Sequence, residues 1–192
     1  MATLVLLLLL AVIGLFRSGS TPTFVKEDLK TIHQDMVRQA EQLAGTLDSG
    51  SRVVVLELDY AIKAHGKRVY DLVFGALKAR GLDIRHVEAL TVDTARGWDP
   101  YAPGFPYAEF VRVVEAYPEV DAVIALCGPP YGLERLALSS VSTRPKLLVA
   151  GGVSGASAAS LCKRGWLHAA TVPRTVTENG ALVQKYELLT SR

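Results

Sequence analysis

Three side chains at the ends of apolar segments offer the reactive groups in this sequence. Asp59 follows one such segment, Asp93 ends the next, and Cys127 closes a third. At neighbouring strand ends, the two carboxylates could bind a metal ion or act as general acid and base. They could equally cap the loops that follow. Cys127 would need a histidine base to act as a nucleophile, and His65 is the candidate because it follows the first strand.

A glycine-rich turn offers a second kind of chemistry. Gly151, Gly152 and Ser154 follow an apolar segment and precede a helix of small residues at 156–164. Free N–H groups and the Ser154 hydroxyl there could bind an anion. The spacing matches neither of the nucleotide-binding glycine motifs, GxGxxG and GxxxxGKS/T. A tight structural turn is therefore favoured over a phosphate site, and no cofactor is predicted.

Three further candidates for ligand binding flank these groups. Tyr60 follows Asp59, and Gly128 follows Cys127. Trp98 lies in the longest irregular segment, residues 94–106, which holds three prolines, two glycines and three aromatic residues. Such a segment is either a self-packed surface loop or a flap that contacts a ligand or a partner.

Composition excludes several classes of function. The net charge is +2, and Lys and Arg are scattered along the chain. Because nucleic-acid binding needs a clustered basic patch, no nucleic-acid partner is predicted. The two cysteines, Cys127 and Cys162, form no CxxC or His/Cys cluster, so no metal site is predicted. Both lie in apolar segments and are predicted to be buried thiols rather than a disulfide.

The run Ala122–Cys127 indicates the strand around which these groups must be positioned. Six apolar residues stand between Asp121 and the Gly128–Pro130 break. A run this short and uniformly apolar is typical of a strand buried on both faces of a parallel sheet. Two consecutive prolines lack N–H groups, which predicts that the ladder stops there. Ligands of open α/β sheets bind at the carboxyl ends of central strands, so this edge is the predicted functional edge.

Strands and helices alternate along the rest of the chain. The order predicts an α/β fold: a three-layer, doubly wound, Rossmann-like arrangement with a mainly parallel five-stranded sheet and a C-terminal hairpin or edge strand. Glu178–Gly180 is the turn signal for that hairpin. The predicted strands are 52–60, 83–93, 122–127, 146–150 and 167–172, with a hairpin of 171–177 and 181–189. The predicted helices are 24–47, 67–80, 107–117, 131–138 and 156–164, and 61–66 is predicted as a loop.

The N-terminal segment is apolar and uncharged over residues 2–16. It is slightly shorter than the roughly 20 residues that a spanning helix prefers. An uncleaved membrane anchor is favoured over a cleaved signal peptide, because no basic residue precedes the apolar run. A buried core helix is the third alternative. The predicted organisation is an anchor or signal segment at 1–17, a linker at 18–23 and an α/β domain at 24–192, in which helix 24–47 could also support a homo-oligomer.

Residues 26–175 resemble the C-terminal lobe of type I periplasmic-binding and LacI-like sugar-binding proteins. The resemblance rests on the leading helix before Arg52 and on four stretches of matching pattern: 68–81, 110–124, 146–152 and 167–173. It implies a periplasmic-binding-like lobe in an extracytoplasmic setting. Members commonly place polar and acidic residues after the third and fourth strands, where this chain has Cys127 and Gly151. No sugar site is therefore carried over.

The favoured function is a membrane-anchored, extracytoplasmic binding or interaction module, with a small-molecule ligand or a protein partner. An enzyme using Asp59, Asp93 or Cys127 is the first alternative. A structural subunit of a membrane-associated assembly is the second.

Overall fold

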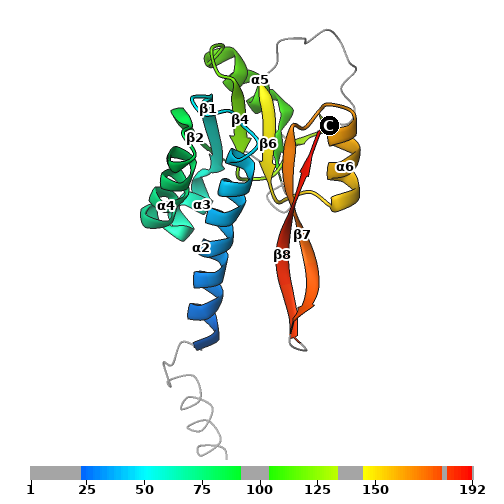
Figure 1. Cartoon of the computed structure of the whole chain (residues 1–192). Coiled ribbons are helices and arrows are strands. Elements are labelled where there is room, and N and C mark those ends of the chain that lie inside the picture. The colour runs from blue at the N-terminus through cyan, green and yellow to red at the C-terminus, as the bar shows by residue number, and fades with distance from the viewer. Residues whose placement is uncertain (1–22, 92–103, 134–144, 179–180, 192) are drawn as a thin grey trace, which may run out of the picture. The chain divides into compact units, whose positions relative to one another are not determined.

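The computed structural model describes residues 23–91, 104–133, 145–178 and 181–191 (Figure 1). The chain forms two compact units, Met1–Gln34 and Asp35–Arg192, and the sheet belongs to the second. The boundary between the units falls inside the first described helix, α2 (Thr23–Ala44). The predicted boundaries at residues 17 and 23 stay predictions.

Six strands form one sheet in the order β2-β1-β4-β6-β7-β8. The first five run parallel, and β8 is antiparallel to β7. The chain goes from β1 outward to β2 and then crosses to the other side of β1, so the direction of winding switches between β1 and β4. The strands are β1 (Arg52–Leu58), β2 (Asp83–Leu90), β4 (Ala122–Ala125), β6 (Lys146–Ala150), β7 (Ala169–Glu178) and β8 (Ala181–Thr190).

Helices cover both faces of this sheet, which gives the predicted three layers. One hydrophobic core packs α5 and α6 against Val54, and the other packs α2 and α4 against Val55. Successive side chains of a strand point to opposite faces, so the buried residues 53–58 of β1 contribute side chains to both cores. The predicted α/β fold is confirmed. The remaining helices are α3 (Asp59–His65), α4 (Lys67–Ala79), α5 (Tyr107–Ala116) and α6 (Gly155–Lys163).

The region after β1 differs from its prediction. The sequence predicts a strand to Tyr60 and a loop over 61–66, whereas the strand ends at Leu58 and α3 begins at Asp59. Two features favour the helix: Asp59 places an acid at its positive end, and Lys63 pairs with that acid one turn later. Asp59 is therefore the first residue of a helix rather than the last residue of a strand.

The Gly-Pro-Pro break also behaves differently from its prediction. Pro130–Tyr131 forms a short strand, β5, that pairs in parallel with β3 (Phe105–Pro106). Proline lacks an N–H but keeps a carbonyl, and the Phe105 amide donates to the Pro129 carbonyl at 3.3 Å. The helix predicted over 131–138 is wrong at Tyr131, and its residues from 134 onward lie outside the described ranges. The loops after β2 and β4 are thus tied to each other.

The C-terminal hairpin is confirmed and extends beyond the sheet as a two-stranded ribbon (Figure 1). β7 pairs with β6 only over Ala169–Thr171, and its remaining residues pair with β8 alone. Two cross-strand ion pairs, Arg174–Glu187 and Lys185–Glu178, lie on the ribbon.

None of the helices within the described ranges combines the length and apolarity needed to cross a membrane. The predicted anchor, residues 2–16, lies outside those ranges.

Candidate functional site

Three loops meet at the carboxyl edge of the sheet, and the structure brings Cys127, Gly128, Gly151 and Gly152 to them. A Cβ added at Gly128 would lie 3.0 Å from the Gly104 nitrogen and 3.4 Å from the Gly152 Cα. Gly128 has a φ of 93°, a value that favours glycine. The backbones of Gly104 and Gly152 therefore leave no room for a side chain at Gly128.

The other predicted site residues either pair with a neighbour in the chain or lie outside what the structure describes. The Asp59 carboxylate binds Lys63 of its own helix at 2.6 Å. Tyr60 belongs to α3, but its side chain is not described, and Asp93 and Trp98 lie outside the described ranges. Whether these four residues contact a ligand stays a prediction.

Ser154 has a structural role in the turn after β6. Its hydroxyl accepts from the Ser157 amide at 3.2 Å, so it is the N-cap of α6. The same hydroxyl donates to the Ser157 hydroxyl at 3.0 Å. These contacts use the groups that an anion would need, which agrees with the favoured interpretation of a tight turn.

Cys127 has the wrong environment for a nucleophile. The thiol packs against the core that contains α5 and α6. Burial, and then the nearby Glu57 carboxylate, raise the pKa of Cys127 well above its ordinary value. A catalytic cysteine needs the opposite shift, because the thiolate is the reactive form. The side chain of His65 is not described, and both cysteines are free thiols.

A cavity of about 210 Å³ lies beside these loops, on the α2 face of the sheet. It is bounded by the second half of α2, by the carboxyl ends of β4 and β6, and by β8. Its lining residues are Met36, Gln39, Leu126, Ala150, Gly151 and Tyr186. None of these six side chains carries a charge. The cavity can therefore hold a small neutral molecule that has both apolar and hydrogen-bonding parts.

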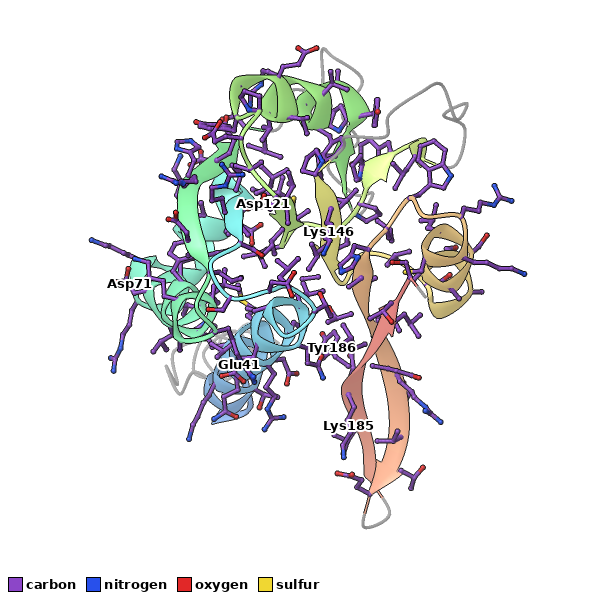
Figure 2. The ribbon with its side chains drawn as sticks, turned by 45° about the horizontal axis from the view of Figure 1, so that its top comes forward. Glu41, Asp71, Asp121, Lys146, Lys185 and Tyr186 are labelled. Atoms are coloured by element: carbon purple, nitrogen blue, oxygen red, sulfur yellow. The ribbon has the colours of Figure 1, made fainter. Side chains whose placement is uncertain are left out.

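Hydrogen bonds fix the polar wall of the cavity. Gln39 is 7% exposed, and its Oε1 accepts from the Thr171 hydroxyl at 2.8 Å. Thr171 in turn accepts from the Gly151 amide through its carbonyl, at 3.0 Å. Burial raises the pKa of Tyr186, and the nearby Asp35 carboxylate adds to the shift, so the phenol stays protonated. Figure 2 shows Tyr186 where β8 passes beside α2, and the Gln42 amide donates to its carbonyl at 3.5 Å.

Neither Gln39 nor Tyr186 was predicted as a site residue. Gln39 stands between Met36 and Ala40 on the apolar stripe of α2, and a glutamine buried on such a face is a usable signal. Tyr186 has no comparable signal. Its place in the cavity depends on the pairing of β8 with β7 and on the packing of α2, which join residues far apart in sequence.

A larger hollow of about 600 Å³ lies at the opposite, amino edge of the sheet. Figure 2 shows Asp121 and Lys146 at this edge. The Asp121 carboxylate is already occupied by Arg52, and the rim residues Asp48 and Ser49 are exposed. We favour the smaller cavity as the site, because it has a buried polar wall and lies at the edge where open α/β sheets bind ligands.

One acid of the sheet is buried: Glu57, the last residue but one of β1. It is 3% exposed, and its Oε1 accepts from the Leu58 amide at 2.7 Å. Burial is the main cause that raises the pKa of Glu57. Tyr70 of α4 is itself 2% exposed: burial raises the pKa of its phenol, and the nearby Glu57 carboxylate adds to the shift.

No protein-family model matches the chain, and no curated protein matches it. Among solved structures, an ABC-transporter solute-binding protein from Burkholderia multivorans aligns over 73% of this chain and 46% of its own, with 14% identity and a TM-score of 0.49. A second, from Burkholderia graminis in complex with D-arabinose, aligns over 73% and 46%, with 14% identity and a TM-score of 0.45.

An enzyme is also similar: ureidoglycine-glyoxylate aminotransferase from Bacillus subtilis aligns over 72% of this chain and 32% of its own, with 13% identity and a TM-score of 0.40. The chain spans less than half the length of each of these proteins. Likenesses at this level carry nothing about the ligand or the activity of this chain.

Proposed function

We propose that this chain is a binding module that holds a small neutral ligand in the cavity between α2, β8 and the carboxyl ends of β4 and β6. The observation that carries the proposal is the cavity itself, with a lining of six uncharged residues and one buried amide, Gln39. Gln39 and Tyr186 carry the polar side-chain groups of the lining. Gln39 Oε1 already accepts from Thr171, and the Tyr186 hydroxyl accepts from Gln184 at 3.5 Å, so the Gln39 N–H groups and the Tyr186 O–H are the donors proposed to meet a ligand's polar atoms. Met36 and Leu126 supply the apolar wall.

The uncharged lining decides the class of ligand. A carboxylate or phosphate bound here would lose its hydration shell without meeting a cation, which costs several kcal/mol. Neutral sugars and small amphipathic molecules avoid that cost. We therefore expect neutral compounds to bind and nucleotides not to bind.

A membrane-anchored, extracytoplasmic setting belongs to the same proposal. Its support is the uncharged apolar segment of residues 2–16. The test is the location of the full chain in membrane fractions before and after deletion of 2–16. Recovery of both proteins in the soluble fraction would overturn the anchor and leave the ligand cavity untouched.

The ligand is tested by a thermal-shift screen of the full chain in detergent against sugars, amino acids and nucleotides. A ligand at 100 times its dissociation constant stabilises the folded protein by about 2.7 kcal/mol, which is readily detected. We expect at least one neutral compound to raise the melting temperature. A screen without any neutral hit contradicts the proposal.

Binding measurements on two variants test whether a compound found in the screen binds in the cavity. Tyr186→Phe removes one polar group and Gln39→Met replaces the buried amide with an apolar chain of similar length, and each should weaken binding at least about tenfold. Thr177→Ala, exposed on the ribbon and paired with Leu182 rather than with a cavity residue, is the matched control and should bind like wild type. A hit whose affinity ignores both cavity variants binds elsewhere and overturns the assignment of the site.

A further inference from the structure

A buried carboxyl without a cation stands at the point where the winding of the sheet switches direction. Glu57 ends β1, beside β4, and is 3% exposed. Within the described ranges, no Lys, Arg or His forms an ion pair with it. The titratable groups that face it come from two other elements: Tyr70 of α4 and Cys127 after β4. Its neighbour in register on β2 is Ala89, which cannot titrate.

The surroundings of Glu57 therefore favour a neutral acid. The Leu58 amide supports the charged form through one hydrogen bond of 2.7 Å, and the Tyr70 phenol adds a weaker interaction. The Tyr70 hydroxyl is buried and forms no hydrogen bond of good geometry in the described part of the chain. A buried carboxylate that lacks a cation costs more free energy than protonation does.

Glu57 is mechanically connected to the ligand cavity. The Leu126 amide donates to the Leu56 carbonyl at 2.9 Å, next to Glu57 in the chain. Leu126 packs against the core that contains Val53 and Val55, and it lines the cavity. Because side chains two apart on a strand share a face, Glu57 points to the same side as Val53 and Val55.

We infer that Glu57 is a proton-binding site that controls the Leu126 wall of the cavity. With the proton bound, β1 and the turn after β4 stay dry and packed, and the wall is closed. When the proton leaves to solvent, the carboxylate draws water to the end of β1 and loosens the contact between Leu126 and Leu56. Ligand affinity then falls as the pH rises; this last step rests on the proposed function.

The test is an NMR titration of the full chain in detergent from about pH 5 to about pH 9, with ¹³C at glutamate carboxyls and ¹⁵N at amides. We expect one glutamate carboxyl to titrate above the others and to be missing in Glu57→Gln. The Leu126 amide should shift with the same midpoint in wild type and be insensitive to pH in Glu57→Gln. Glu115→Gln, at an exposed position of α5, should leave both titrations unchanged.

Tyr70→Phe gives a second measurement that does not depend on Glu57→Gln folding. Removing the phenol takes away a group that favours the charged form, so the midpoint of Glu57 should move to higher pH. A midpoint that moves down, or a Glu57 carboxyl that titrates with the exposed glutamates, overturns the inference.

The inference and the proposed function fail separately. If Glu57 titrates high but the Leu126 amide does not follow, the control of the cavity is overturned, while ligand binding can still be measured at one pH. If the ligand screen fails but both NMR signals titrate together in wild type, the proton site stands and the proposed function falls.

Discussion

Two carboxyl groups in this chain have pKa values that their surroundings shift in opposite directions. Asp121 accepts from the backbone and the guanidinium of Arg52 at 2.8, 3.2 and 3.0 Å, and these bonds lower its pKa to about 2. Glu57 is buried without a cation, and burial raises its pKa. The two surroundings explain the contrast. Asp121 stays in contact with solvent and pairs with a cation, whereas Glu57 is shielded from solvent and has no cation beside it.

The Asp121–Arg52 pair should contribute modestly to stability at neutral pH and nothing in strong acid. A lowered folded-state pKa adds stability above the ordinary aspartate pKa of 3.8 and loses it as the pH falls through about 2. The carboxylate side chain is 44% exposed, so Asp121→Asn should cost about 1 kcal/mol or less at pH 7. Urea unfolding of the variant and the wild type at pH 7 and at about pH 2 measures this difference in the free energy of unfolding. Asp71→Asn, an exposed acid on α4, is the control, and an equal loss for Asp121→Asn in strong acid would contradict the assignment.

Residue types in the sequence predicted which residues lie at the carboxyl edge of the sheet, but they did not predict which residues line the cavity. Cys127 and Gly151 lie at the edge where they were expected. The Asp59 carboxylate binds Lys63 of its own helix, and its contact with a ligand stays a prediction. Gln39 was not predicted although a glutamine on the apolar stripe of α2 is a usable signal, and Tyr186 has no comparable signal in the sequence. Only tertiary packing brings a helix glutamine and a hairpin tyrosine to one cavity.

At the scale of elements, the three loops at the carboxyl edge form a closely packed unit. Gly104 precedes β3, Gly128 follows β4 and Gly152 follows β6, and a Cβ at Gly128 would crowd the backbones of the other two. The parallel pairing of β3 and β5 adds hydrogen bonds to the same contact. The edge is therefore held by backbone atoms, which leaves side-chain chemistry to the neighbouring cavity.

Gly128→Ala should destabilise this unit by about 2–4 kcal/mol, which combines the left-handed backbone cost with overpacking. The new Cβ would lie 3.0 Å from the Gly104 nitrogen. Gly132→Ala is the matched control, because Gly132 has a φ of 71° and no atom within 4 Å of an added Cβ. The control should cost only about 1–2 kcal/mol. Equal costs in urea unfolding would show that the close contact of the loops is unimportant.

The C-terminal ribbon should be the least protected part of the sheet. An isolated two-stranded hairpin is marginally stable in water, and beyond Val172 the ribbon has no other strand beside it. Hydrogen exchange should show amides of 174–177 opening locally, while those of Leu147–Val149 in β6 exchange only through global unfolding. Equal protection of the two sets would show that something other than strand pairing stabilises the ribbon.

Elements with a strong apolar pattern in the sequence were predicted with nearly correct ends. Short elements whose residues suit more than one local structure were not predicted. β6 matches its predicted range, because the apolar residues 147–150, preceded by Lys146, lie between a proline and two glycines. α3 was missed because seven residues give no apolar stripe, and its acid–lysine pair becomes a signal only once a helix is assumed. β5 was missed because the prolines were judged by their absent N–H alone, although their carbonyls can accept.

At the scale of the whole molecule, the alternation of apolar strands and amphipathic helices was sufficient to predict the three layers. Residues 53–58 of β1 and all four residues of β4 are buried. Because their side chains alternate between the two faces of the sheet, they contribute to both cores. That arrangement leaves an acid at the end of β1 with nowhere to reach solvent. The raised pKa of Glu57 is thus a consequence of the fold, and it should appear in the stability of the whole domain.

Stability should therefore be greatest on the acid side of neutrality, at about pH 4–5. A raised folded-state pKa at Glu57 gives stability that is complete below the ordinary glutamate pKa of 4.5 and is lost as the pH rises toward the folded-state value. Asp121 acts in the other direction and removes stability only as the pH falls toward 2. Glu57→Gln should match wild type near pH 4 and exceed it increasingly up to neutral pH, as measured by urea unfolding across this range. A wild-type free energy of unfolding that rises from pH 5 to pH 7, with no gain from Glu57→Gln, would show that Glu57 ionises at its ordinary pKa in the folded chain.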